Sequence, residues 1–326
     1  MSRLLTVNGL TTHFKTERGT VCAVNDVSYH INEREILGLV GESGCGKSVS
    51  QLSVMQLIPT PPGRITAGSV EFEGVNLLNY SRNSREMCDV RGNKISMVFQ
   101  EPMTSLNPAM KISKQMAEVL LEHKKMDLSE AREQSIDMLA QVGIPDPAGR
   151  IDDYPHQLSG GMRQRIMIGI AMLCNPKLII ADEATTALDA TIQAQLLELM
   201  YEIVNNHNTA LVMVTHNLGV VARYAHRINV MYAGKIVESG TVKEIWANPM
   251  HPYTEGLLQC VPRLGEKLVP IKGMPPSLID RPNTCAFLAR CKMREKRCFD
   301  EPARDITSVE GSHYTTCRVK LEGAGL

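Results

Sequence analysis

The sequence lacks three features that would place a protein in a broad class at once: a net charge, a long apolar run and a secretion signal. Its 35 Lys and Arg residues balance its 35 Asp and Glu residues, so no excess positive charge is available for nucleic acid. No uninterrupted apolar window reaches the roughly 18 residues that a membrane-spanning helix needs. The first residues, MSRLLTVNGLTTHF, lack the apolar core and cleavage site of a signal peptide. We therefore expect a cytosolic chain that does not bind nucleic acid.

The sequence also lacks a Cys-x-x-Cys pair, although it contains nine cysteines. In a reducing compartment, cysteines are more often metal ligands or buried thiols than disulfides. Cys22, Cys45, Cys88 and Cys174 are scattered and are interpreted as ordinary core or surface thiols.

Strand and helix patterns alternate along most of the chain. Strands are predicted over residues 21–31, 35–40, 69–72, 94–99, 177–181, 210–214 and 227–231. Helical spacing occurs over residues 47–57, and further helices begin near Thr191 and Asn217. Residues 113–142 have a helical period and no strand pattern, which indicates an all-helical insertion. Such alternation predicts an α/β fold with a mostly parallel sheet.

The composition changes near Pro249. Proline- and glycine-rich segments follow, and four cysteines fall within residues 285–317. We expect a main domain over residues 1–248, with a helical part at about residues 101–175, and a separate C-terminal region over residues 249–326 with little regular structure.

The stretch GESGCGKS, residues 41–48, matches the phosphate-loop pattern G-x-x-x-x-G-K-[ST] and lies between a predicted strand and a predicted helix. Its glycines let backbone N–H groups turn inward around an anion. Lys47 would reach the β- and γ-phosphates, and the Ser48 hydroxyl would ligate Mg²⁺. The alternative is a glycine-rich turn that binds nothing.

An apolar strand, KLIIADE, ends in Asp182 and Glu183. In phosphate-loop proteins the carboxylate on the magnesium side occupies this position. Asp182 would hold the metal through water, and Glu183 would polarise the attacking water. The alternative is a pair of exposed acids at a strand end.

The stretch LSGGMRQR, residues 158–165, places Ser159, Gly160 and Gly161 before a helix. This would be a second anion site at a helix N-terminus in the same chain. One nucleotide does not need two such sites, so we expect this turn to bind the γ-phosphate held by a partner's phosphate loop. The alternative is a plain capping turn.

With these motifs in this order, residues 4–249 resemble the ATP-binding-cassette (ABC) ATPases. The resemblance implies an ABC-type nucleotide-binding domain, with a phosphate-loop sheet core and a helical subdomain, followed by a small Cys-rich C-terminal element. It also implies that Phe14 stacks on adenine, Gln100 couples the insertion to the site, and His216 contacts the γ-phosphate. The family usually has proline after the catalytic glutamate, where this chain has Ala184.

The resemblance assigns residues to three roles. Glu183, His216 and Gln100 would act in hydrolysis, while Ser48, Gln100 and Asp182 would hold Mg²⁺. The ATP-binding residues would be Phe14, Gly41, Glu42, Ser43, Gly44, Cys45, Gly46, Lys47, Ser48, Ser159, Gly160, Gly161, Gln164 and Asp189.

The C-terminal segments NPMHPYTEGLL and CAFLARCKMREKRCFDEPA resemble the ATPase subunits of peptide importers, most closely the first subunit of dipeptide and oligopeptide systems. The implied protein is an ATP-hydrolysing motor at the cytoplasmic face of the membrane. Its implied partners are a second, homologous ATPase, two permease subunits and an extracytoplasmic binding protein. An importer of nickel or oligosaccharide and a soluble non-transport ABC ATPase are the alternatives. Only about 110 residues, without heptads, separate the phosphate loop from LSGG, which disfavours a coiled-coil repair ATPase.

Cys285, Cys291, Cys298 and Cys317 are separated by 5, 6 and 18 residues. Structural zinc sites favour a Cys-x-x-Cys knuckle, so an irregular wrap of four thiolates fits a [4Fe–4S] cluster at least as well. The family resemblance also points to an iron–sulfur site in some members. The alternatives are zinc, and unligated thiols or disulfides. Cys260 is less suited, because it lies in the apolar helical run GLLQCV.

The helical insertion would provide a groove for a short permease helix. Met103, Leu106 and Met110 would line this groove, or would be ordinary core residues of the insertion.

Overall fold

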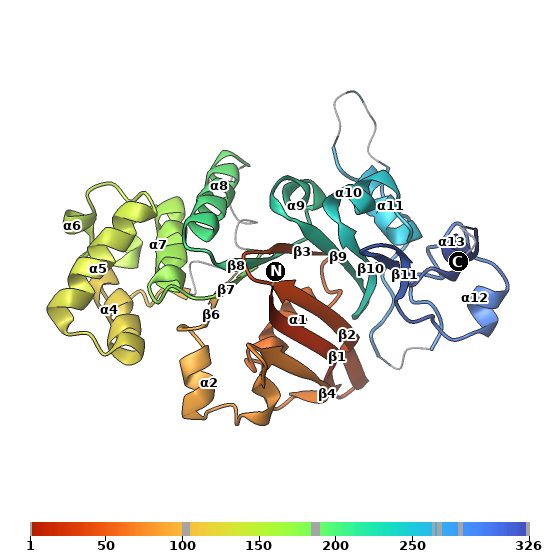
Figure 1. Ribbon diagram of the computed structural model, residues 1–326, viewed down its shortest axis with the longest axis horizontal. Coiled ribbons are helices and arrows are strands. Elements are labelled where there is room, and N and C mark those ends of the chain that lie inside the picture. The colour runs from red at the N-terminus through yellow and green to blue at the C-terminus, as the bar shows by residue number, and fades with distance from the viewer. Residues whose placement is uncertain are drawn as a thin grey trace. The chain divides into compact units, whose positions relative to one another are not determined.

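The computed structural model describes residues 2–99, 105–183, 190–262, 265, 269–279 and 283–323. The chain divides into two compact units. The first comprises Met1–Asn32, Ile36–Asn79 and Met213–Leu326, and the second comprises Glu33–Glu35 and Tyr80–Val212. Figure 1 labels most of their helices and strands.

The first unit contains an antiparallel sheet with the strand order β2-β1-β4-β5. Its strands are β1 (Arg3–Thr16), β2 (Gly19–Asn32), β4 (Gly63–Phe72) and β5 (Val75–Asn76). The sequence predicted β2 and the end of β4 but missed β1. Register shifts at several points along β1, such as the one between Val7 and Leu10, interrupt the alternation that would have revealed it.

The first unit also contains strands in the order β11-β12-β10-β9-β3. They are β3 (Ile36–Val40), β9 (Arg227–Tyr232), β10 (Lys235–Thr241), β11 (Thr307–Glu310) and β12 (His313–Thr315). β3 pairs with β9 in parallel, and the other pairs are antiparallel. A Cβ atom on Gly38 of β3 would lie 2.1 Å from Val221, so the glycine lets α9 (Leu218–Tyr224) approach the strand closely.

The remaining helices of the first unit follow β3 or β10, or lie in the C-terminal region. They are α1 (Lys47–Val54), α10 (Val242–Ala247), α11 (Pro252–Gln259), α12 (Arg297–Asp300) and α13 (Arg318–Gly323). The C-terminal region contains short helices and strands, and β12 extends the strand order beyond β10. Tyr253 and Phe287 of this region pack in one apolar cluster with Val230 and Tyr232 of β9. This packing accounts for the inclusion of the C-terminal region in the first unit.

The second unit has strands in the order β8-β7-β6, with β8 crossing the division between the units after Val212. Its elements are α2 (Arg85–Val90), β6 (Ile95–Val98), α4 (Ile112–Lys124), α5 (Leu128–Gln141), α6 (Pro147–Arg150), α7 (Gly160–Met172), β7 (Leu178–Asp182), α8 (Ala190–Asn206) and β8 (Ala210–Thr215). The predicted all-helical insertion is confirmed: α4 packs against α5, and α5 packs against α7 (Figure 1).

None of the helices in these described ranges combines the length and the apolar character needed to cross a membrane.

Candidate functional site

The phosphate loop lies between β3 and α1 in the first unit. Gly44 and Gly46 have φ angles of 77° and 105°, in the backbone region that favours glycine. A Cβ atom on Gly46 would lie 2.2 Å from the carbonyl oxygen of Ala23, and one on Gly41 would lie 2.2 Å from that of Met231. The turn therefore favours glycine at positions 44 and 46, and the close approach of neighbouring backbone requires Gly41 and Gly46.

Lys47 begins α1 and is only 4% exposed. Its Nζ atom donates hydrogen bonds to the carbonyl oxygens of Gly41 at 2.8 Å and Glu42 at 3.1 Å. The N-cap residue, Gly46, offers no side-chain acceptor to the first N–H groups of α1. An ammonium group folded over its own loop and a helix N-terminus without a side-chain cap are together suited to an anion.

The adenine-stacking candidate and the histidine candidate also lie in the first unit. Phe14 is half-buried on β1, where it pairs with Gly63 of β4. His216 directly follows β8 and is exposed. The next residue, Asn217, caps α9 by accepting hydrogen bonds from the N–H groups of Gly219 and Val220.

Asp182 and Glu183 lie in the second unit. β7 is buried along its whole length, and Asp182 at its end is 7% exposed. Glu183 has a φ of 45°, a left-handed conformation that residues other than glycine rarely adopt. The backbone thus turns sharply at the residue predicted to act in hydrolysis.

Ser159 caps α7 by accepting a hydrogen bond from the N–H of Met162 at 3.2 Å. Ser159 is exposed, and no atom lies within 4 Å of a Cβ built on Gly160. Gln164, by contrast, is 1% exposed. The accessible part of the predicted turn is therefore its Ser-Gly segment, whereas Gln164 packs inside the unit.

Several predicted residues lie outside the described residues: Gln100, Met103, Ala184 and Asp189. Of the two other residues predicted to line a groove on the insertion, Leu106 is 3% exposed and Met110 is half-buried. Leu106 therefore has the burial of a core residue, as the alternative interpretation requires.

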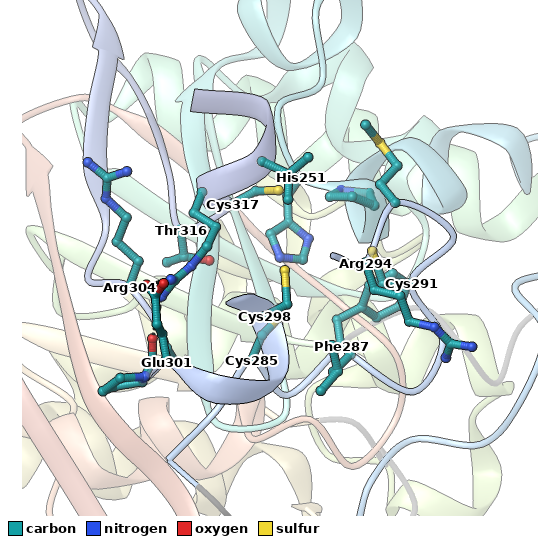
Figure 2. A pocket seen from close by; sticks show the side chains of 17 residues that line it. His251, Cys285, Phe287, Cys291, Arg294, Cys298, Glu301, Arg304, Thr316 and Cys317 are labelled. Carbon is teal, nitrogen blue, oxygen red and sulfur yellow. Dashed lines mark hydrogen bonds and ion pairs between the residues drawn. The ribbon is translucent and has the colours of Figure 1, made fainter. Parts of the chain in front are cut away.

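The four C-terminal cysteines line one cavity, which His251 also lines (Figure 2). Burial raises the pKa of the Cys285, Cys291 and Cys317 thiols above the usual value. The cavity thus favours neutral thiols unless a cation compensates the thiolate charge. Cys260 does not line it, and its Sγ donates to the carbonyl oxygen of Val269 instead.

His251 is buried at this cavity in its neutral form. Burial lowers its pKa to about 4. Its Nδ1 accepts a hydrogen bond from the N–H of Tyr253 at 3.1 Å, so the neutral ring carries its proton on Nε2. Within the described part of the chain, no group of three or more His, Cys, Asp or Glu side chains is arranged to hold a single metal ion.

Sequence reasoning missed three residues that join the C-terminal region to the rest of the first unit. Tyr253 and Arg290 contact Glu42 of the phosphate loop, and Glu238 binds the start of α11. The run HPY, residues 251–253, could have indicated a role for Tyr253, but it indicated only the family resemblance. Nothing in the sequence distinguished Arg290 from its basic neighbours.

Comparisons with known proteins agree with this geometry. Residues 24–186 match the family described as "ABC transporter", and residues 237–298 match "Oligopeptide/dipeptide transporter, C-terminal region". The chain is 48% identical over 320 residues to the dipeptide transport ATP-binding protein DppD of Bacillus subtilis (strain 168), covering 97% of this chain and 95% of that protein. It is 46% identical over 326 residues to DppD of Escherichia coli (strain K12), covering 99% and 98%.

A solved structure of the ATP-binding cassette MJ0796, a dimer in a post-hydrolysis state bound to ADP and Pi, has the same fold. It matches with a TM-score of 0.64 at 24% identity, over 73% of this chain and 98% of that one. The fold and the phosphate loop define an ABC ATPase. More particularly, the chain belongs to the dipeptide/oligopeptide importer family of ABC transporter ATP-binding proteins. It is the ATPase subunit of such an importer, and it acts with permease and ATPase partners.

Proposed function

We propose that this chain powers the import of dipeptides or short oligopeptides. The observation that carries the proposal is the identity of nearly half the residues across almost the whole chain, C-terminal region included, with dipeptide transport ATP-binding proteins. Import of nickel or oligosaccharide is the alternative within the same machinery. The solute is recognised by a separate binding protein and the permeases, so no residue of this chain selects it.

In the proposed mechanism, the phosphate loop binds the triphosphate of ATP. Lys47 moves its ammonium group from the loop carbonyls to the β- and γ-phosphates, and the N–H groups at the start of α1 donate hydrogen bonds to phosphate oxygens. The Ser48 hydroxyl, the Asp182 carboxylate and the Gln100 amide are hard oxygen donors of the kind that Mg²⁺ prefers. Bound Mg²⁺ would neutralise phosphate charge.

Glu183 acts as the base that orients and polarises the attacking water, and His216 contacts the γ-phosphate. Phe14 stacks on the adenine ring. The exposed Ser159–Gly160 segment contacts the γ-phosphate of ATP held by the partner ATPase, so two cassettes close around two nucleotides. Asp189 and Gln164 complete the proposed set of ATP-binding residues, with Gln164 acting from inside the unit.

We propose that the partner ATPase is a homologous but different subunit, and that two permeases and an extracytoplasmic binding protein complete the importer. The chain would then lie peripherally at the cytoplasmic face of the membrane. We retain the proposed boundary between residues 248 and 249, since the Cys-rich segment follows it.

We also propose that Cys285, Cys291, Cys298 and Cys317 hold a [4Fe–4S] cluster, with zinc as the alternative. The four thiols line one cavity, and burial of Cys285, Cys291 and Cys317 disfavours their thiolates unless a cationic centre compensates the charge. Among the described residues no group of three or more such side chains is arranged for one metal ion, so the proposal rests on the shared cavity and on the burial of the thiols. Bound there, the cluster would cross-link the C-terminal region.

The metal proposal is tested by matched cysteine variants of the anaerobically purified protein. Cys298→Ser should lose bound iron and the brown colour, whereas Cys260→Ser should keep both. A colourless wild-type protein with one equivalent of zinc would decide for zinc, and a metal-free wild-type protein would overturn the proposal.

The transport proposal is tested by reconstituting the chain with its permeases and binding protein in vesicles. ATP turnover should rise with di- or oligopeptides and not with nickel or oligosaccharide. Stimulation by nickel or oligosaccharide alone would replace the peptide proposal with that solute.

A further inference from the structure

Glu42, in the phosphate loop, makes an ion pair with Arg290 of the Cys-rich segment (residues 285–317). Nη1 of Arg290 lies 2.6 Å from Oε2 of Glu42, and Nη2 lies 2.8 Å from Oε1. The Arg290 side chain is 5% exposed and that of Glu42 is 27% exposed. This is a two-point, largely buried contact, the geometry in which a guanidinium fixes a carboxylate most firmly.

Arg290 is itself held in place by other groups. Its Nε donates to the carbonyl oxygen of Lys272 at 3.1 Å, and Nη1 donates to the Tyr232 hydroxyl at 3.3 Å. Its guanidinium carbon lies 5.8 Å from the ring centres of Tyr232 and Phe287. The guanidinium therefore meets Glu42 in one orientation.

Tyr253 holds the backbone of the same loop residue. Its hydroxyl accepts a hydrogen bond from the N–H of Glu42 at 2.8 Å. The Tyr253 side chain is fully buried, and its ring centre lies 4.5 Å from that of Tyr232 and 5.5 Å from that of Phe287. The C-terminal region thus fixes both the main chain and the side chain of Glu42.

The peptide groups fixed in this way are the ones that Lys47 uses. The Nζ of Lys47 donates to the carbonyl oxygens of Gly41 and Glu42, on either side of the N–H that Tyr253 binds. A shift of Glu42 would therefore move the two carbonyl oxygens that accept hydrogen bonds from the Lys47 ammonium group.

We propose that Arg290 and Tyr253 are positioning residues for nucleotide binding, which hold the phosphate loop in place through their contacts with Glu42. The affinity of the phosphate loop for ATP then depends on the folded Cys-rich segment. Neither residue touches the nucleotide in this proposal. Both act on the loop, so their loss should raise the Kd for ATP and the KM for hydrolysis more than it lowers kcat.

The test measures binding of a fluorescent ATP analogue with Mg²⁺ to the full-length protein. Arg290→Met keeps the apolar stem and removes the ion pair, and should weaken binding about tenfold or more. Tyr253→Phe removes only the acceptor for the Glu42 N–H, and should weaken binding by about threefold. Lys292→Met removes an exposed charge from the same segment and should leave binding unchanged.

A double-mutant cycle separates positioning from general destabilisation. Glu42→Gln and Arg290→Met should together weaken binding no more than the more severe single change. Fully additive losses, or unchanged binding by both Arg290→Met and Tyr253→Phe, would overturn the proposal. Tyr253→Phe keeps the ring packing, so this variant alone tests the proposal if Arg290→Met does not fold.

Discussion

Two glycines in the phosphate loop differ in whether they tolerate a larger side chain. Gly44 and Gly46 both have positive φ angles, but only Gly46 lies against another backbone segment, at Ala23. A methyl group at Gly44 meets open space, whereas one at Gly46 meets a carbonyl oxygen at 2.2 Å.

Alanine at these two glycines should therefore have unequal effects. Gly44→Ala should lower the free energy of unfolding by about 1–2 kcal/mol, the usual cost of a left-handed non-glycine residue, and should retain ATP binding. Gly46→Ala should abolish ATP binding, because the loop must shift to admit the Cβ atom. Thermal unfolding and nucleotide titration of both variants check this, and equal affinities would contradict it.

Glu183 allows the chemical step to be separated from binding. Glu183→Gln keeps the size of the side chain and removes the base, so turnover should fall by about two to four orders of magnitude while ATP still binds. Steady-state phosphate release and nucleotide titration measure the two quantities. Near wild-type turnover would remove Glu183 from the proposed role.

Tyr29 links β2 to α1 and titrates abnormally. Its hydroxyl lies 3.1 Å from Nε2 of Gln51, and burial raises its pKa to about 12. Because the folded state keeps a proton that the unfolded state releases, stability should fall as the pH rises from about 10 to about 12.

Tyr29→Phe should reduce this alkaline loss by roughly 2–3 kcal/mol. Chemical unfolding of both proteins across that pH range is the measurement. Parallel curves for wild type and variant would show that Tyr29 is not the titrating group.

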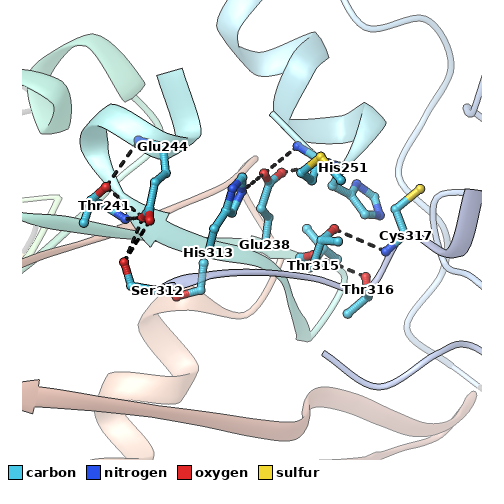
Figure 3. Close-up of polar contacts among 12 residues, drawn as sticks. Glu238, Thr241, Glu244, His251, Ser312, His313, Thr315, Thr316 and Cys317 are labelled. Atoms are coloured by element: carbon cyan, nitrogen blue, oxygen red, sulfur yellow. Dashed lines mark hydrogen bonds and ion pairs between the residues drawn. The ribbon is translucent and has the colours of Figure 1, made fainter. Parts of the chain in front are cut away.

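Among helices and strands, the junction of β10, α11 and β12 depends on one buried carboxylate. Glu238 is fully buried and accepts hydrogen bonds from the N–H groups of Met250 at 2.6 Å and His251 at 2.8 Å. Nε2 of His313 on β12 lies 2.7 Å from its Oε1 (Figure 3). One side chain thus joins a strand, a helix start and the C-terminal hairpin.

Glu238→Gln should lower the free energy of unfolding by about 2–4 kcal/mol, since its amide NH₂ would face a backbone N–H donor inside the protein. Glu310→Gln, at an exposed position of β11, is the matched control and should change stability little. Denaturant unfolding of both variants, monitored by circular dichroism, measures the two changes in the free energy of unfolding. Equal stability of the two variants would contradict the assigned role of Glu238.

The sequence was sufficient where the determinants are contiguous. The glycines and Lys47 that shape the phosphate loop lie within eight residues, 41–48, so the pattern alone located it. It was insufficient where partners are distant: Glu42 and Arg290 are 248 residues apart, and no local period pairs β12 with β10. The four cysteines predicted to act together line one cavity, but the neighbouring His251 was not recognised, because its place depends on the packing of α11.

For the chain as a whole, the proposed metal centre and the nucleotide loop are joined by one segment. Arg290 lies between Cys285 and Cys291, next to the second of them. Removal of the metal by an anaerobic chelator should therefore weaken ATP binding several-fold in the wild-type protein. Arg290→Met should show little further loss on the same treatment. An unchanged affinity of the wild-type protein for ATP after complete metal loss would show that the two sites are independent.

The pairing of β12 with β10 has a consequence for any shortened form of this protein. Without residues 307–315, the Glu238 and Ser239 edge of β10 would present N–H and C=O groups with no strand beside them. Such a free edge recruits strands from other molecules. A truncated cassette would be prone to self-association, so the last part of the chain also protects the protein from aggregation.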